Sequence, residues 1–183
     1  AVKILVGVHT NVAHKIVGIK AVKHILLTPF FVAIFKHVSV KAIYKYAVFH
    51  AVLLYELYHF FNAKVDGRTQ ADHFMEAMAL YFSGCRVGFA VDFEIEETEH
   101  QLAELQSFMT RMRDYGHTPI VYCGDFSKAR VIAATNNAPL WIARWRKRLP
   151  NTLCKFWQFT NKPYDLDLFL GEMSELSLLL EWV

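Results

Sequence analysis

The chain has 183 residues, of which 54% are hydrophobic, 15% aromatic and 20% charged, with a formal net charge of +3. This composition is typical of one globular domain with a sizeable core and excludes wholesale disorder. The early uncharged stretch from His24 to Phe35 has only 12 residues, too few to cross a bilayer, so we expect no membrane span. Three scattered cysteines, Cys85, Cys123 and Cys154, exclude a disulfide scaffold, although one bridge or three free thiols are both compatible with this number.

The positive charge is concentrated at the start of the chain. Residues 1–60 carry seven lysines and one acid, Glu56, whereas residues 61–183 have a net charge of −3. A basic half can contact nucleic acid or another anionic polymer, but a solvated basic face is the more usual explanation. No nucleic-acid-binding motif accompanies the lysines, so we expect no nucleic acid partner.

Apolar runs dominate the first third of the chain. They predict strands, at residues 2–8, 30–35 and 52–60. The stretch 40–50 is compatible with a helix. Thr69 can cap a helix that continues to about Phe82, because apolar residues recur along it at helical spacing.

Strands and helices alternate in the rest of the chain. A run from Val87 to Glu94 is first apolar and then acidic, which predicts a strand that leads into a polar site. Thr98 and Gln101 have the spacing of a capping box for a long helix that ends before Gly116. Further strands are predicted at residues 117–123, 139–143 and 155–160, with a short helix at 126–134 and a partly helical segment at 168–180.

This alternation predicts an α/β fold with a largely parallel sheet. Helices that shorten toward the end favour a barrel over an open sheet, although 183 residues is short for a full eightfold barrel. No glycine-rich phosphate loop occurs, so a nucleotide site has no local support. No linker is evident, and residues 1–183 are therefore predicted to form a single domain.

The most informative feature is the acidic end of the strand that begins at Val87. In an extended segment, Asp92 and Glu94 project from one face while Phe93 and Ile95 pack on the other. Two crowded carboxyl groups can have separated pKa values, which is what a glycosidase needs for a proton donor beside a carboxylate. A helix start or a divalent-metal site would use the same residue types.

Aromatic residues recur at the ends of the predicted strands. Tyr58 ends one strand, and Trp141 and Trp157 lie on two later ones. Pyranose rings present C–H groups that stack on aromatic faces, so this pattern favours a sugar-binding cleft. Core packing is the alternative for each aromatic residue taken alone.

Seven short blocks in a fixed order extend this interpretation. They are Tyr-His-Phe, Gln-Ala-x-x-Phe, Val-Asp-Phe-Glu, Pro-Ile-Val-Tyr, Pro-Leu-Trp-Ile-Ala-Arg, Trp-Gln-Phe-Thr and Asp-Leu-Asp-Leu-Phe, starting at Tyr58, Gln70, Val91, Pro119, Pro139, Trp157 and Asp165. Through these blocks, residues 58–169 resemble the family 25 glycoside hydrolases, the lysozyme-type muramidases of bacteria, phages and fungi. The resemblance implies an irregular (β/α) barrel with a shortened second half. It also implies cleavage of the β-1,4 bond between N-acetylmuramic acid and N-acetylglucosamine in peptidoglycan.

The resemblance also assigns roles to individual residues. Glu94 matches the proton donor, Asp92 the neighbouring acid, and Asp165 a late aspartate at the far rim of the cleft. The strand-end aromatic residues that match the sugar-binding positions are Tyr58, Tyr122, Trp141 and Trp157. The resemblance implies no metal and no cofactor. Because peptidoglycan lies outside the membrane, we expect a secreted protein or one delivered by a phage or larger assembly.

The chain departs from the family pattern at its start. The family opens with Gly-hydrophobic-Asp-hydrophobic-Ser, but here the nearest counterpart has His9 in place of the aspartate, and no aspartate precedes Asp66. Residues 1–55 also lack Asp, Glu, Arg, Gln, Met, Trp and Cys. Three explanations stay open: misassigned residues in this segment, a different role for His9, or a catalytically degenerate relative that binds cell walls.

Overall fold

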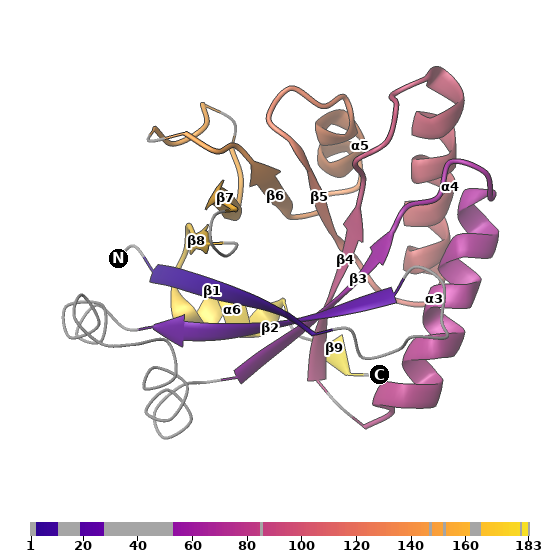
Figure 1. Cartoon of the computed structure of the whole chain (residues 1–183). Coiled ribbons are helices and arrows are strands. Elements are labelled where there is room, and N and C mark those ends of the chain that lie inside the picture. Colours follow the sequence, from indigo (N-terminus) through magenta and orange to yellow (C-terminus); the bar gives the residue numbers. More distant parts are fainter. Residues whose placement is uncertain are drawn as a thin grey trace.

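A computed structural model describes residues 3–10, 19–27, 53–84, 86–146, 148–151, 153–161, 166–179 and 181–182. The predicted elements at 30–35 and 40–50 lie outside these residues, as does Asp165. Within the described part, strands and helices alternate from β3 to β6 (Figure 1). The predicted α/β class is therefore confirmed.

The strands form a mixed sheet. They are β1 Lys3–Thr10, β2 Ile19–Leu27, β3 Leu53–Phe60, β4 Arg86–Asp92, β5 Ile120–Gly124, β6 Leu140–Ala143, β7 Phe156–Thr160, β8 Leu166–Phe169 and β9 Glu181–Trp182. Hydrogen-bonded neighbours follow the order β3-β2-β1-β8-β7-β6-β5-β4-β9, and β3 also pairs with β4. The pairings from β3 through β7 by way of β4, β5 and β6 are parallel, and the others are antiparallel. The parallel half brings the carboxyl ends of β3 to β7 to one edge of the sheet.

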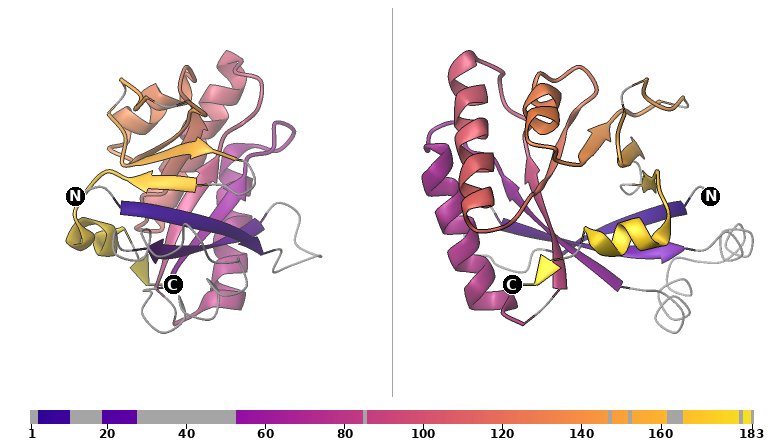
Figure 2. Two further views of the ribbon diagram at one scale, coloured as in Figure 1. Left: turned by 60° about the vertical axis from the view of Figure 1, so that its left-hand side comes forward. Right: turned by 180° about the vertical axis from the view of Figure 1, so that it is seen from behind.

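The helices are α3 Gly67–Phe82, α4 Glu99–Asp114, α5 Ala129–Thr135 and α6 Met173–Leu178. Figures 1 and 2 show α3 and α4 side by side against the sheet. The predicted cap of α4 is confirmed, because the Thr98 hydroxyl accepts a hydrogen bond from the Gln101 backbone N–H at 3.2 Å. The predicted cap of α3 is wrong. Asp66, three residues before Thr69, is the cap, since its carboxylate accepts from the Thr69 backbone N–H at 2.9 Å.

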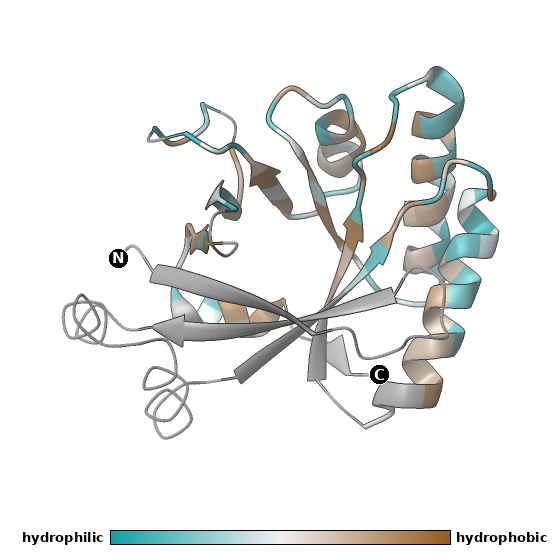
Figure 3. Ribbon diagram, in the orientation of Figure 1, coloured by the Kyte–Doolittle hydropathy of each residue, from teal (hydrophilic) through white to brown (hydrophobic). Residues whose placement is uncertain are grey.

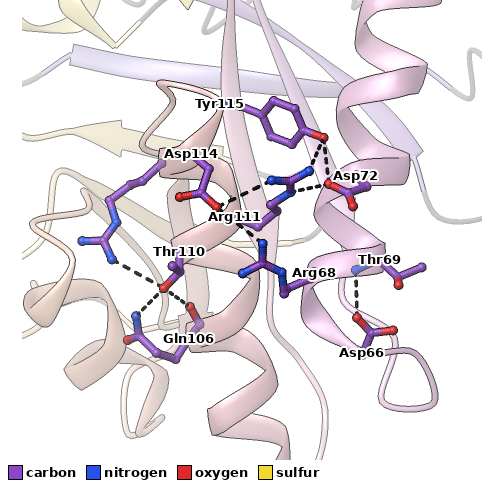
Figure 4. A network of polar contacts seen from close by, with 10 residues as sticks. Asp66, Arg68, Thr69, Asp72, Gln106, Thr110, Arg111, Asp114 and Tyr115 are labelled. Carbon is purple, nitrogen blue, oxygen red and sulfur yellow. Dashed lines mark hydrogen bonds and ion pairs between the residues drawn. The ribbon is translucent and has the colours of Figure 1, made fainter.

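The contact between α3 and α4 is unusually close at one end. A Cβ atom on Gly67 would lie 1.9 Å from the backbone oxygen of Glu104, so only glycine fits there. Farther along, Asp72 accepts hydrogen bonds from Arg111 Nε at 2.6 Å and from the Tyr115 hydroxyl at 2.7 Å (Figure 4). These bonds, led by the one from Arg111, lower the pKa of the Asp72 carboxyl. The close backbone contact at Gly67 and the hydrogen bonds to Asp72 together fix α3 against α4.

Side chains alternate between two core clusters along the parallel strands. The first core cluster lies between the sheet and the helices and includes Val91, Val121 and Ile142 beside Phe74 and Phe108. The second core cluster lies on the other face, against α6; its buried members are Tyr58, Ala90, Ile120, Trp141, Phe156, Phe169 and Leu176. Figure 3 shows that the described parts of β4, β5 and β6 are largely hydrophobic. Because both faces are covered, the central strands read as nearly continuous apolar runs.

Three described strands were not predicted. β2 was not foreseen, and β9 lies beyond the last predicted element. The last two residues of β8, Leu168 and Phe169, fall in the segment 168–180 that was expected to be partly helical, and α6 lies in the same segment as expected. All three pair in antiparallel fashion, and each has one neighbour that is not the strand before it in the chain: β2 pairs with β3, β8 with β1 and β9 with β4. β5 also starts later than predicted, at Ile120, after Pro119, which has no backbone N–H to donate.

Candidate active site

The acidic pair lies at the carboxyl end of β4. Asp92 is the last residue of that strand and is 8% exposed, whereas Glu94 lies two residues beyond it and is exposed. Phe93 is buried in the first core cluster, and Ile95 packs against the same cluster. The predicted alternation of packing and polar positions is thus confirmed for Phe93 and Ile95. Glu94 is accessible to a ligand, and Asp92 is largely enclosed by the fold.

The strand end is held by its neighbours on both sides. The Phe93 backbone N–H donates to the Tyr122 carbonyl at 2.9 Å, and the Phe61 N–H donates to the Asp92 carbonyl at 2.9 Å. Main-chain hydrogen bonds therefore continue beyond the last residues of β3 and β4. The backbone on both sides of Asp92 is consequently fixed.

Register places predicted site residues in one row across the sheet. Asp92 pairs with Tyr122 on β5, and Tyr122 pairs with Trp141 on β6. Directly opposed residues of parallel strands share a face, and the rings of Tyr122 and Trp141 are in edge contact, with centroids 5.0 Å apart. Tyr58 pairs with Ala90, two residues before Asp92, and is buried in the second core cluster. Four of the predicted residues therefore belong to the same face.

Trp157 occupies the opposite face. It pairs with Ile142 and belongs to the first core cluster. Its indole Nε1 donates to the Arg144 carbonyl at 2.9 Å, which fixes the chain just after β6. The structure therefore separates Trp157 from the row that contains Tyr122 and Trp141.

Two polar residues that were not predicted from the sequence bond to this row from the same face, two residues along from Phe156 and Phe169. The side-chain oxygen of Gln158 accepts from the Tyr122 hydroxyl at 2.9 Å and from Trp145 Nε1 at 3.0 Å. Asp167 on β8 is fully buried and accepts from Trp141 Nε1 at 2.7 Å. Gln158 and Asp167 are themselves opposed in register. Both lie within blocks of the resemblance, and the period of two along each strand is the signal that could have identified them.

The loops that follow β4, β5 and β6 are joined by side chains. The Glu97 carboxylate accepts hydrogen bonds from the Ser127 hydroxyl and, at 3.0 and 3.1 Å, from the Lys128 backbone N–H. Asp125, which is buried, forms an ion pair with Arg144 at 2.9 Å. These three loops therefore form one connected set at the carboxyl ends of the strands that carry the row of site residues.

A second buried contact joins two blocks of the resemblance. His59 Nε2 lies 2.8 Å from the side-chain oxygen of Gln70, and the imidazole stacks on Phe108 with ring centroids 5.5 Å apart. Gln70 also accepts from the Asn62 backbone N–H at 2.7 Å and donates to the Val65 carbonyl at 2.7 Å. Burial lowers the pKa of His59, so the imidazole is neutral at pH 7. This arrangement fixes the turn between β3 and α3.

Three further observations concern His9, metal binding and membrane spans. His9 lies on β1 and pairs with Val22. No group of three or more His, Cys, Asp or Glu side chains in the described ranges could hold a metal ion. A helix long and apolar enough to cross a membrane is likewise not found there.

Comparison with known proteins gave one match. The model of glycosyl hydrolases family 25 matches residues 39–168, most of the chain, and this range includes Asp92, Glu94 and Asp165. No curated protein and no solved structure matches the chain. The family match spans nearly all the blocks noted in the sequence and the strands that carry the row of site residues. The chain therefore belongs to glycosyl hydrolases family 25.

Proposed function

We propose that the protein is a lysozyme that hydrolyses the β-1,4 bond between N-acetylmuramic acid and N-acetylglucosamine. Membership of the family implies peptidoglycan hydrolysis in general terms. The observation that carries the finer proposal is the position of Asp92 and Glu94 at the end of β4, beside the aromatic residues Tyr122 and Trp141. A glycosidase requires a pair of carboxyl groups, and aromatic rings beside them favour the binding of a sugar.

In this proposal Glu94 is the general acid. Its exposure allows it to reach the glycosidic oxygen of a bound polymer and to protonate the leaving group. Asp92, enclosed at the strand end, stabilises the positive charge that develops at the sugar carbon. Asp165 completes the acidic set from the far rim, on the strength of the resemblance alone.

The aromatic residues have different parts in substrate binding. Tyr122 is half-buried, and its hydroxyl is held by Gln158, so one edge of its ring is positioned for contact with a sugar. Tyr58 and Trp141 are buried and form the floor beneath it. Trp157 contributes through the Arg144 carbonyl, by fixing the loop after β6.

We further propose that the fold is an irregular (β/α) barrel with a shortened second half, formed by one domain. The additional pairing of β3 with β4 supports a barrel. β3 is the first strand of the sheet order and β4 is the last before β9, so their pairing joins the two sides of the sheet. The short α5, and the direct passage from β6 to β7 without a described helix, support the shortened half. Because the substrate is extracellular, the protein acts outside the cytoplasm, after secretion or delivery by a phage.

The test is the release of reducing ends from purified peptidoglycan. We expect Glu94→Gln to lower the rate by about 10²- to 10⁴-fold, the usual contribution of a general acid. Glu96→Gln is the matched control, because it removes an exposed carboxylate two residues away, and its rate should stay near that of the parent. Circular dichroism should show both variants folded.

The alternative is a catalytically degenerate module that binds cell walls, and His9 at the position of the family's early aspartate favours it. This alternative predicts saturable sedimentation with walls and no product from the parent protein. Release by the parent and Glu96→Gln, but not by Glu94→Gln, would exclude it.

A further inference from the structure

The charge of one segment near the site is strongly one-sided. Between Asp125 and Asp165 the sequence contains eight lysines and arginines and no aspartate or glutamate. Part of this charge is neutralised within the fold, since Arg144 pairs with Asp125 and Lys155 pairs with Glu175 at 2.6 Å.

Three of these basic residues, Arg146, Lys147 and Arg148, are consecutive and lie in the basic loop, which we define as residues 144–155 between β6 and β7. Arg146 and Arg148 are exposed there, and neither forms an ion pair with any residue in the described ranges. Lys147 lies between them in the sequence. The loop therefore presents guanidinium groups to solvent.

An aromatic ring stands among these charges. Trp145 is 57% exposed, yet its Nε1 is anchored to the Gln158 oxygen at 3.0 Å. Gln158 accepts at the same atom from Tyr122, a residue of the proposed sugar-binding row. The exposed indole is thereby connected directly to the site.

The base of the basic loop is fixed at the strand ends. The Arg144 backbone N–H donates to the Gln158 carbonyl at 3.0 Å, and the Arg144 carbonyl accepts from Trp157. Figure 1 shows the described part of the loop projecting beyond β6 and β7, and Figure 3 shows this part as largely hydrophilic. The described part of the basic loop thus stands at the rim of the site.

We propose that the basic loop binds the carboxylates of the peptide stems carried by the glycan, with Arg146 and Arg148 as the binding residues. This inference rests on the proposed muramidase function. A glycan held along the row of site residues carries its stems at the rim, where a guanidinium matches the planar geometry of a carboxylate. Trp145 of the loop is bonded to Gln158, which also bonds to Tyr122 of the site. This connection favours a ligand that belongs to the substrate itself over a separate charged surface.

The test measures binding and does not depend on cleavage. Proteins carrying Glu94→Gln, which prevents digestion, are sedimented with insoluble peptidoglycan freed of phosphate polymers, at low salt. Adding Arg146→Gln and Arg148→Gln should weaken binding about tenfold, and salt should diminish the difference. The control adds Arg68→Gln and Arg113→Gln, which remove the same charge from exposed positions on α3 and α4 and should leave binding unchanged.

The same peptidoglycan with its carboxylates converted to methylamides provides the decisive comparison. All three proteins should bind this amidated polymer equally. Equal binding to native peptidoglycan, or a difference that persists after amidation, would overturn the proposal. A difference confined to walls that retain phosphate polymers, or to phosphatidylglycerol vesicles, would also overturn it.

Failure of the muramidase proposal would be recognised separately. The reducing-end assay on the parent protein reports bond cleavage, whereas sedimentation reports recognition of carboxylates. A protein that releases no ends but shows the amidation-sensitive difference would still support recognition of the stems by this loop.

Discussion

The indole Nε1 of Trp141 donates a 2.7 Å hydrogen bond to the carboxyl group of Asp167, which has no exposed surface. The bond spans from β6 to β8, two strands that are not neighbours in the sheet. A buried carboxyl group is stable only where donors compensate for its lost hydration. The hydrogen bond between Trp141 and Asp167 therefore helps to hold β6, the strand that carries Trp141 of the site, against β8.

Trp141→Phe should reduce stability, because it keeps an aromatic ring but removes the only hydrogen-bond donor of the indole. We expect a loss of about 1–3 kcal/mol, the usual cost of removing a partner from a buried polar group. Urea denaturation measures this loss. Asp167→Asn, which keeps an acceptor oxygen, should cost less, and an unchanged midpoint for Trp141→Phe would contradict the assigned bond.

Gly67→Ala tests the close approach of α3 to α4. The added Cβ would lie 1.9 Å from the Glu104 oxygen and 2.8 Å from the Phe108 nitrogen, both backbone atoms that cannot rotate away. We expect a loss of at least about 1–3 kcal/mol, as in other overpacked sites. Gly124→Ala is the control, since nothing lies within 4 Å of its added carbon. Equal stability of the two variants in thermal denaturation would refute the predicted clash.

His59 should make stability depend on pH. Burial lowers its pKa in the folded protein below the ordinary value of 6.5, against a smaller opposing effect of its bond to Gln70. The unfolded chain therefore binds the proton more readily, so the free energy of unfolding decreases as pH falls below about 6.5. The contribution to the slope is at most about 1.4 kcal/mol per pH unit.

The measurement for His59 is urea denaturation between pH 5 and pH 8. His59→Gln should flatten the slope in the acidic half of this range. His100→Gln, which removes an exposed imidazole on α4, serves as the control and should preserve the parent's slope. A parent protein whose stability rises on acidification from pH 7 to pH 5 would exclude neutral, buried His59 as the dominant group.

The described cysteines should be chemically inert in the folded protein. Cys123 and Cys154 are free and buried, and burial raises their pKa values to about 12 and about 11. Iodoacetamide at pH 8 should therefore leave both unmodified, because the thiolate is the reactive form. Both should react in guanidinium chloride, and peptide mass spectrometry distinguishes the sites. Rapid alkylation of native Cys123 would contradict its placement in the core.

Local patterns predicted the part of the site carried by β4 and α4. The alternation around Asp92 and the capping pair Thr98 and Gln101 are encoded by neighbouring residues, and the structure reproduces both. Gln158 and Asp167 were missed because their significance depends on which strands pair and in what register. The period of two places each of them on one face of its strand, but it does not show that Gln158 meets Tyr122 or that Asp167 meets Trp141, which are 36 and 26 residues away in the sequence.

The same limit explains the misplaced elements. β8 was not separated from the segment 168–180, which was expected to be partly helical, because its four residues are too few for their period of two to stand out beside the helical pattern that follows. The start of α3 was displaced for a different reason. Asp66 and Thr69 are both good capping residues, and the tight fit of Gly67 against α4 favours the earlier start.

The contacts among the loops after β4, β5 and β6 have a consequence for engineering. Glu97 holds the backbone of the second loop, Asp125 of the second loop holds Arg144 of the third, and the third is tied to β7 through Trp157. Each loop supplies a charge or a carbonyl that its neighbour requires. Transplanting the first loop alone would remove the acceptor of the Ser127 hydroxyl and the Lys128 backbone N–H, and transplanting the third alone would remove Arg144, the ion-pair partner of buried Asp125. Specificity in this scaffold is best exchanged by moving the three loops as one cassette.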